Sequence, residues 1–345
     1  MAGPERTRGR RAAGWLTLIL AALIGAAGVD AVWAQDIRYF RLGIGPSNST
    51  SYRIGEIIAG AISNPPGSRE CERGGSCGVP GLIAVAQSTA GSVGNVEAIG
   101  RGTLEGAIVQ ADVAFWAYYG AGIYTPAGAI RDLRAVANLF RDSIHLVARA
   151  DAGIASIADL KGKRVAMGEP GSGTLVDSQL LLKAFNLKEA DVRPAYLKTG
   201  QAIDQMVDGK LDALFLVGLA PSQEIAELAE RLPIKLVPVA GPEIAELRRT
   251  TPFFVETSIP AGLYAGVEQK TATLGIGALL VVPTRIAEDV VYGITKALWH
   301  KSTRASLDAG HPQGKQIQIE SALQGVPIPL HPGAERYYRE IKMID

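Results

Sequence analysis

The sequence predicts an α/β fold with two lobes. Short apolar stretches with strand composition alternate with stretches of helical spacing, which is typical of parallel sheets covered by helices on both faces. This rhythm restarts at residue 164, and two unusually continuous apolar strands, 143–150 and 274–284, flank the second set of units. We expect these two strands to pair and to carry the chain between lobes. One continuous sheet is the alternative.

The expected elements follow in chain order. Short β-rich runs mark the strands, and apolar residues three and four apart mark the helices. In the first half we expect strands at 37–45, 81–89, 104–110 and 133–140, and helices at 52–63, 91–102 and 111–120. In the second half we expect strands at 164–168, 192–197, 211–218 and 234–239, and helices at 173–187, 200–210 and 220–231.

Domain boundaries follow from the two continuous strands. Lobe I is expected to comprise 35–145 and 280–345, and lobe II 146–279. The C-terminal tail, 325–345, should therefore pack on lobe I.

The first 34 residues read as a secretory signal peptide. A basic start, RTRGRR, precedes an uncharged apolar run at 15–28 that is short for a membrane span. Val32 and Ala34 are the small residues that a signal peptidase requires, so we expect cleavage after Ala34. The mature chain would have 345 − 34 = 311 residues. An uncleaved membrane anchor is the alternative.

Length, composition and charge limit the class of protein. A mature chain of this length forms one large domain or two lobes, and 47% hydrophobic residues suit a substantial core. The net charge of +1 becomes about −1 when the signal, with four arginines and two acids, is removed. A net charge this close to zero does not indicate a nucleic-acid-binding protein.

The two cysteines lie close together in the sequence CERGGSC. In an oxidising compartment, Cys71 and Cys77 indicate a small disulfide loop within a surface insertion. Half of a zinc site is the alternative, but none of the four histidines is near the pair in sequence. We therefore expect no metal.

Four strand-to-helix junctions are rich in glycine or small hydroxyl residues. They are 45–52, 87–92, 109–112 and the stretch MGEPGSGT at 167–174. Backbone N–H groups at helix N-termini can hold an anion without a fixed cation. The last stretch comes within one residue of a P-loop but lacks its lysine, so a carboxylate fits it as well as a phosphate. Simple helix capping is the alternative at each junction.

The sequence contains few signs of catalysis. It has no Gly-x-Ser-x-Gly elbow and no His-Glu-x-x-His motif. Asp112 could be taken for a general base, but an acid in the first turn of a helix is favoured by the helix dipole alone. We expect no enzyme, no catalytic residue and no cofactor.

The chain resembles the TAXI family of solute-binding proteins, which serve TRAP (tripartite ATP-independent periplasmic) transporters. The segments that carry the resemblance are QSTAGSVGNVEAI, GAIVQADVAFWAYYG, LRAVANLFRDSIHLVARADAGIASIADLKGKRVAMGEPGSGT, GKLDALFLVG, LVVPTRIAEDVVYGITKALW and LHPGAERYYRE. The match as a whole covers nearly all of the mature chain, and these segments occur in the order that the family has.

The resemblance implies a fold and a function. The fold is the type II periplasmic-binding-protein fold, with two α/β lobes, two crossover strands and a cleft between them. The function is the capture, in the periplasm, of a small organic anion: an acidic amino acid such as glutamate, or a dicarboxylate. Delivery would be to the membrane subunits of a TRAP permease driven by an ion gradient, and the protein would be a monomer. A binding module for a sensor and a secreted enzyme on the same fold are the alternatives.

The candidate ligand-binding residues come from the four junctions and the strand at 211–218. Backbone N–H groups and hydroxyls would hold the carboxylate, Gln110 would bond a polar group, and Tyr52 and Phe215 would form walls. The full set is Ser49, Thr50, Ser51, Tyr52, Ser88, Thr89, Ser92, Gln110, Gly171, Ser172, Gly173, Thr174 and Phe215.

The first junction departs from the family, which has a Gly-Gly-Thr-Tyr-Tyr-Pro type of turn there. Side chains replace glycines that let a backbone approach closely, and Arg53 replaces a proline. One hypothesis is that Asn48 or Arg53 changes ligand choice, for example by meeting a second carboxylate. The alternative is that Arg53 points into solvent.

Overall fold

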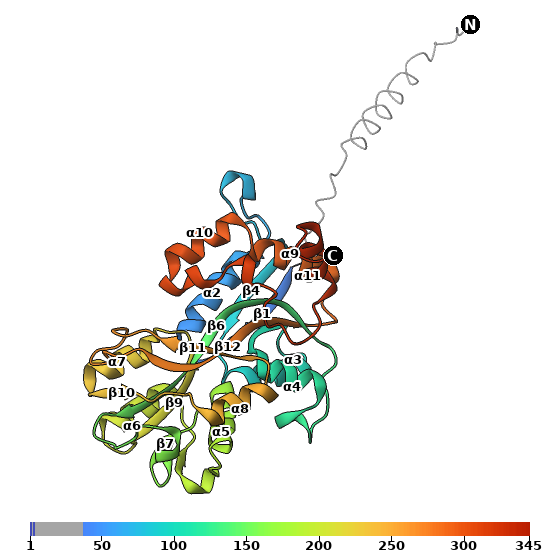
Figure 1. Ribbon diagram of the computed structural model, residues 1–345. Helices are drawn as coiled ribbons and strands as arrows, with labels where there is room; N and C mark the ends of the chain where they lie inside the picture. The colour runs from blue at the N-terminus through green and yellow to red at the C-terminus, as the bar shows by residue number, and fades with distance from the viewer. Residues whose placement is uncertain (2, 4–36) are drawn as a thin grey trace. The chain divides into compact units, whose positions relative to one another are not determined.

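A computed structural model of the chain describes residues 1, 3 and 37–345 (Figure 1). The expected signal peptide and its cleavage site lie almost wholly outside the described residues. Ile37–Asp345 forms one compact unit. No helix within the described part of the chain combines the length and apolarity needed to cross a membrane.

The central feature of this unit is one hydrogen-bonded sheet. Its path runs β4-β1-β5-β12-β6-β9-β7-β8, with β10 on β6 and β11 on β12. The strands are β1 (Arg38–Gly43), β4 (Leu82–Gln87), β5 (Gly106–Gln110), β6 (Leu133–Arg149), β7 (Arg164–Ala166), β8 (Arg193–Ala195), β9 (Ala213–Gly218), β10 (Ile234–Leu236), β11 (Phe254–Ile259) and β12 (Thr271–Pro283). A separate short pair joins β2 (Ser63–Asn64) to β3 (Val79–Pro80).

Helices cover the sheet. Figure 1 shows α2, α9, α10 and α11 around one part of the sheet and α5, α6, α7 and α8 around the other. The helices are α2 (Thr50–Ile62), α3 (Ser92–Gly100), α4 (Ala111–Tyr119), α5 (Gly173–Ala184), α6 (Thr199–Val207), α7 (Gln223–Arg231), α8 (Pro242–Thr250), α9 (Glu288–Leu298), α10 (Lys301–Gly310) and α11 (Pro332–Glu340). The sequence predicted none of β2, β3, α8 and β11, and it gave no bounds for the C-terminal helices α9, α10 and α11.

Two long strands, β6 and β12, run through the middle of the sheet and join its two parts. The strands expected at 133–140 and 143–150 are one continuous strand. β12 pairs with β6 from Leu133 as far as Ser143, and from Ser143 onward β6 pairs with β9. The expected partners 143–150 and 274–284 therefore meet only at Ser143 and Gly275. Because both strands continue from one part into the other, the hydrogen bonding is that of a single sheet.

The sheet is mixed, whereas the pattern predicted parallel sheets. β1 is parallel to β4 and β5, and β7 is parallel to β8 and β9, as expected of strands linked by helices. The two long strands cause the difference, because β12 runs antiparallel to β5 and β6, and β6 runs antiparallel to β9. Alternation of strands and helices does not reveal this direction.

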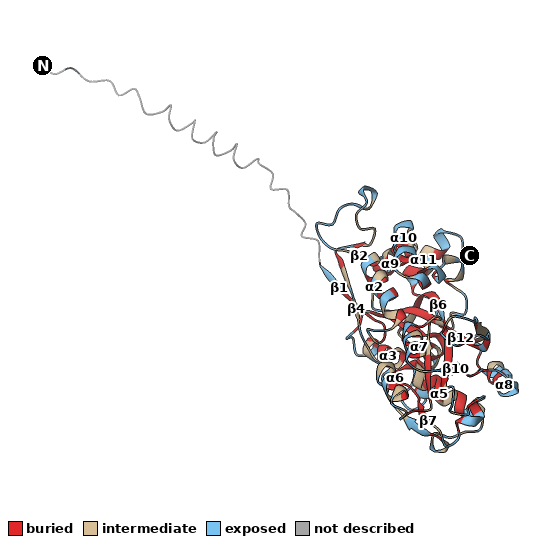
Figure 2. Ribbon diagram, turned by 90° about the vertical axis from the view of Figure 1, so that its left-hand side faces the viewer, coloured by how far each residue is buried: buried red, intermediate tan, exposed pale blue. Residues whose placement is uncertain are grey.

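Apolar residues pack on both faces of the sheet. All five residues of β5 are buried, which explains why it reads as a continuous apolar run. Figure 2 shows buried residues concentrated along β6 and β12. The C-terminal tail covers β6 as expected: the hydroxyl of the fully buried Tyr338 donates to the carbonyl of Val136, and Leu330 bridges to Ala135.

Candidate functional site

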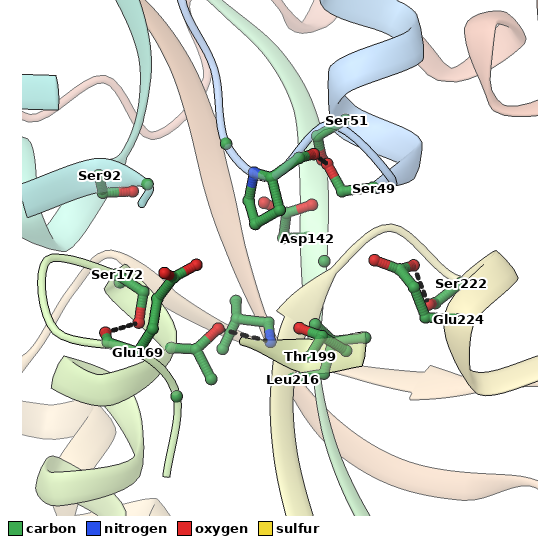
Figure 3. Close-up of a pocket in the computed structure, with 18 of the residues that line it drawn as sticks. Ser49, Ser51, Ser92, Asp142, Glu169, Ser172, Thr199, Leu216, Ser222 and Glu224 are labelled. Atoms are coloured by element: carbon green, nitrogen blue, oxygen red, sulfur yellow. Dashed lines mark hydrogen bonds between the residues drawn. The ribbon is translucent and has the colours of Figure 1, made fainter. Parts of the chain in front are cut away.

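A cavity lies where the two parts of the sheet meet, and helices from both parts point their N-termini at it. Its volume is about 110 Å³. Its lining includes the residues that begin α2, α3 and α5 and residues of β6 and β9. Figure 3 shows Ser49 and Ser51 on one side, Ser172 and Glu169 on another, and Ser222 with Glu224 on a third.

Serine N-caps fix two of these helix starts. The hydroxyl of Ser49 accepts the N–H of Tyr52 at 3.1 Å and donates to the carbonyl of Pro46 at 2.8 Å. Ser172 does the same for α5, accepting from Leu175 N–H at 3.1 Å. The alternative of helix capping is therefore correct for both hydroxyls. What each helix still offers a ligand is the N–H groups of its first turn, which have no partner inside the helix.

The P-loop-like stretch packs directly against the start of α3. The N–H of Gly94 donates to the carbonyl of Gly171 at 3.0 Å. A side chain at Gly171 would also press on Ala90 at 3.2 Å. The glycine-rich sequence therefore lets two loops approach each other closely, since a Cβ would hold them apart.

Gln110 connects three elements beside the cavity. Its Nε2 donates to Asp177 Oδ2 at 2.9 Å, and its Oε1 accepts the hydroxyl of Ser92 at 3.2 Å. Gly173 lies so close beneath that a Cβ there would overlap Gln110 Oε1. The side chain of Gln110 is thus held between α3 and α5.

Two buried carboxyl groups lie behind this glutamine. Asp112 and Asp177 are both inaccessible to solvent, and they lie close enough for the charge of Asp112 to act on the carboxyl group of Asp177. Burial raises the pKa of Asp112 to about 6. Burial and then the neighbouring charge of Asp112 raise the pKa of Asp177 well above its ordinary value. Like-charged carboxyls so close cannot both ionise readily, so the pair retains a proton.

A third acid, Asp142, lines the cavity from the middle of β6. It is 7% exposed, and its Oδ1 has no hydrogen-bond partner. Burial raises its pKa to about 7. Figure 3 shows its carboxyl group near the centre of the site, between Ser49 and Thr199.

Glu169 and Glu224 complete the acidic lining. Glu224 is 5% exposed and accepts the hydroxyl of Ser222 at 2.7 Å. Burial raises the pKa of both glutamates; the Ser222 hydrogen bond opposes this at Glu224, and the charge of Lys198 opposes it at Glu169. Among the described residues that line this cavity there is no lysine, arginine or histidine.

A buried histidine and tyrosine position the Ser222 side of the cavity. The hydroxyl of Tyr264 accepts the N–H of Ser222 at 2.8 Å and therefore donates to His145 Nε2, 2.9 Å away. His145 Nδ1–H then donates to the carbonyl of Ser143 at 3.0 Å. Burial lowers the pKa of His145 to about 4, so the imidazole is neutral and serves as a fixed acceptor.

Nine of the sequence-predicted ligand-binding residues line this cavity. They are Ser49, Thr50, Ser51, Ser92, Gln110, Ser172, Gly173, Thr174 and Phe215. Three others, Asn48, Ser88 and Thr89, line a neighbouring outer cavity instead, together with Lys198. Glu169 and Pro46 belong to both linings, so the outer cavity adjoins the inner one.

Three predicted residues lie outside both linings. Tyr52 turns toward β4, where its hydroxyl reaches the carbonyl of Ala86 at 3.5 Å. Gly171 packs on α3 as described above. Each helix residue is turned about 100° from the last, so Arg53 projects in a different direction from Tyr52. Its side chain is 63% exposed and pairs with Glu56 at 3.3 Å.

Several lining residues were missed, above all Asp142, Glu169, Thr199, Ser222 and Glu224. A signal existed for one of them: Arg141 and Asp142 are charged residues inside an otherwise apolar run, and the sequence prediction broke the strand there. For Thr199 and Ser222, both at helix starts after strands, the junction rule applied but was not extended to them. Nothing in the local sequence distinguishes Glu224 from a first-turn helix acid.

The disulfide prediction is confirmed. Cys71 and Cys77 are bonded, with their Cα atoms 4.7 Å apart. The fold brings His300 to the pair, with Nε2 4.0 Å from Cys71 Sγ, although no histidine is near in sequence. Because both thiols are consumed in the disulfide, this trio offers no thiolate ligands for zinc.

Comparison with solved structures finds matches at low sequence identity. A protein from Bordetella bronchiseptica RB50 matches with 16% identity, 89% of each chain covered and a TM-score of 0.50. The MOPS-bound alkanesulfonate-binding protein SsuA from Xanthomonas axonopodis pv. citri matches with 15% identity over 89% of this chain and 85% of that one, at a TM-score of 0.43. A putative L-cystine ABC transporter from Listeria monocytogenes matches with 12% identity over 83% and 98%, at a TM-score of 0.47.

Two α/β parts joined by two long strands, with a cavity where they meet, define the periplasmic-binding-protein fold that the resemblance implied. The family follows from the sequence itself. The family model described as NMT1-like matches residues 42–341, which is nearly all of the described unit. The chain belongs to the NMT1-like family.

Proposed function

We propose that this protein is a periplasmic solute-binding protein that captures a small organic solute in the inner cavity. The single observation that carries the proposal is the convergence of helix N-termini from both parts of the sheet on one cavity. Ligands of open α/β sheets bind at the carboxyl ends of strands, against such helix starts. Export through the signal peptide 1–34 would deliver the mature chain to the periplasm.

The two lobes would be those that the sequence predicts, 35–145 with 280–345 and 146–279. In support, β6 exchanges β12 for β9 as its partner near Ser143, close to the first boundary. A solute that touches both lobes binds their closed arrangement more tightly than the open one, and so shifts the population toward closure. The closed surface would then be the form that a membrane permease recognises.

The solute would be an organic acid whose carboxylate meets the first N–H groups of α2, α3 and α5. Residues 49–51, Ser92 and 172–174 line the cavity at these helix starts, in support of that role. Gln110 would bond a polar group of the solute, and Phe215 would form an apolar wall. Asn48, Ser88 and Thr89 would act in the outer cavity, and Tyr52 and Gly171 would shape the loops without touching the solute.

The proposed partner is a TRAP permease driven by an ion gradient, which rests on the TAXI resemblance. A binding module for a sensor is the second candidate, and uptake assays separate the two. Membrane vesicles that contain the permease subunits should accumulate solute only with the binding protein and an ion gradient, and without ATP. An enzyme on this fold would release a changed product, so solute recovered chemically intact after binding would count against catalysis.

A thermal-shift screen of the mature protein tests the function. The protein would first be unfolded and refolded to remove copurified solute, then screened against amino acids, dicarboxylates, keto acids and sugars. A solute at about one hundred times its Kd should add about 2.7 kcal/mol, or several degrees in Tm. The Gln110→Ala variant should lose the shift, and the surface variant Arg53→Ala should keep it. No shift with any compound would contradict the proposal.

A further inference from the structure

Asp142 is a buried acid for which the fold supplies an incomplete set of hydrogen-bond partners. It interrupts the long apolar strand β6, which reads LRAVANLFRDSIHLVAR. Its side chain faces the inner cavity and is more than nine-tenths buried, yet Oδ1 finds no hydrogen-bond partner among the described residues. Burying a polar group without a partner costs stability, and most buried polar groups in folded proteins have one. An unpartnered acid aimed into a cavity therefore indicates a ligand group.

Among the described residues, no positive side chain lines the inner cavity beside Asp142, and Lys198 lies in the adjoining outer cavity. Arg141, the preceding residue on β6, points to the opposite face and packs over Gly275. Around the cavity, the charged groups that face Asp142 are themselves acids: Glu224 near the start of α7, Glu169 after β7, and Asp177 behind Gln110.

The helix N-termini and the acids favour solute groups of opposite charge. N-termini of α2, α3 and α5 favour a negative group, whereas three acids in the lining and two more behind it favour a positive one. A dicarboxylate would place one carboxylate at the helix N-termini, but it would bring a further negative charge beside Asp142. A solute with both a carboxylate and an amine would place its negative group at the helix N-termini and its positive group beside the acids.

We infer that the solute carries a protonated amine, and that Asp142 is the residue that accepts its N–H groups, with Glu224 and Glu169 adding negative potential around it. This inference rests on the proposed function and narrows its solute class. Amino acids fit the site and simple dicarboxylates do not. A charged ammonium bonded to a buried carboxylate is a strong, short-range contact, so it can discriminate between solutes of the same shape.

Matched pairs of compounds test the inference on the refolded mature protein. Each pair replaces the amine by a hydroxyl: L-glutamate and L-2-hydroxyglutarate, L-aspartate and L-malate, L-alanine and L-lactate. Succinate and 1,4-diaminobutane separate the carboxylate from the amine. Titration calorimetry should give the amine member of the best-bound pair at least tenfold higher affinity than its hydroxyl partner. Tight binding of 1,4-diaminobutane would support the amine contact and would show that the solute does not need a carboxylate.

Two variants assign the effect to Asp142. Asp142→Asn keeps the shape and removes the charge, so the affinity for the amine member should fall at least tenfold and the preference within the pair should shrink toward one. Asp151→Asn removes a carboxylate from an exposed ion pair with Arg149 and should leave the preference unchanged.

The outcomes are distinguishable. Equal or tighter binding of the hydroxyl member or of succinate overturns the inference and leaves the proposed function standing. An amine preference that survives in Asp142→Asn overturns the role of Asp142. No binding by any compound overturns the proposed function, and this inference with it. The matched pairs are decisive on the wild-type protein even where Asp142→Asn fails to fold.

Discussion

Asp112, in the first turn of α4, and Asp177, in the middle of α5, are two fully buried acids that lie close enough to perturb each other's ionisation. Two carboxyl groups buried this close together cannot both ionise readily, so one of them keeps a proton. The pair lies directly behind Gln110, whose amide donates to Asp177 and whose oxygen accepts from Ser92. The protonation of this pair is thus linked to the wall of the inner cavity.

Stability should fall as pH rises through the acidic range. The pKa values of Asp112, about 6, and Asp142, about 7, and the raised pKa of Asp177 all exceed the value of about 4 in an unfolded chain. Between pH 4 and 7 the folded state therefore holds more protons, so the free energy of unfolding decreases with pH. His145, with its pKa lowered to about 4, opposes this slope between pH 4 and 6.5.

Asp112→Asn isolates the contribution of the pair. The difference in free energy of unfolding between Asp112→Asn and wild type should increase by roughly 1–3 kcal/mol from pH 5 to pH 8, because the asparagine cannot ionise. Urea unfolding at a series of pH values measures this difference. Asp151→Asn is the sign control: its ion pair with Arg149 lowers the pKa of Asp151, so removal should give no such gain. Parallel curves for wild type and Asp112→Asn would contradict the prediction.

Gly173→Ala should disrupt the contact between α5 and Gln110. The added methyl group would overlap Gln110 Oε1, so α5 must shift or the glutamine must leave its three-way contact. We expect a loss of roughly 1–3 kcal/mol in stability, as for overpacking, together with weaker solute binding. Thermal unfolding with and without solute measures both effects.

Two companion variants test the cause of that loss. Gln110→Ala makes room for the methyl group, so the double variant should lose less stability than the two single losses added together. Gly60→Ala places a methyl group in open space inside α2 and should be stabilising by up to about 1 kcal/mol. Equal effects of alanine at positions 60 and 173 would show that the overlap is unimportant.

Tyr264→Phe should loosen the Ser222 side of the cavity. It removes the acceptor of the Ser222 N–H and the donor to His145, leaving two buried polar groups without partners. We expect a loss of about 2–4 kcal/mol in the free energy of unfolding and a reduced affinity for solute. Tyr39→Phe, at a 67% exposed site on β1, is the control and should change neither. A wild-type stability for Tyr264→Phe would argue against the hydrogen-bonded chain.

The disulfide should affect stability without affecting solute binding. Replacing Cys71 and Cys77 by serine opens a loop of only a few residues, so the chain-entropy model gives a loss of about 2 kcal/mol. Neither cysteine lines the inner or the outer cavity, so affinity should be unchanged. Denaturation of wild type with and without reductant gives an independent measure. A change in affinity would mean that the surface insertion that contains the disulfide is energetically coupled to the inner cavity.

Local rules in the sequence predicted most elements and much of the cavity lining. Apolar spacing located α2, α3 and α5, and small hydroxyl residues after strands located Ser49, Ser92 and Ser172. These signals are local, because a helix start needs a cap and a strand needs apolar residues within a few positions. The same rules could not tell a hydroxyl that caps a helix from one left free for a solute.

The sequence by itself determined the α/β alternation, the disulfide and the family to which the chain belongs, since each depends on residues close together or on motifs in order. Only the tertiary structure decided the direction of β6 and β12, the burial of Asp142 and the pairing of Asp112 with Asp177. Those properties depend on which distant segments face each other. A carboxyl group has the same sequence letter in solvent and in the interior of the fold, but its pKa and its available partners are set by the residues that the fold packs around it.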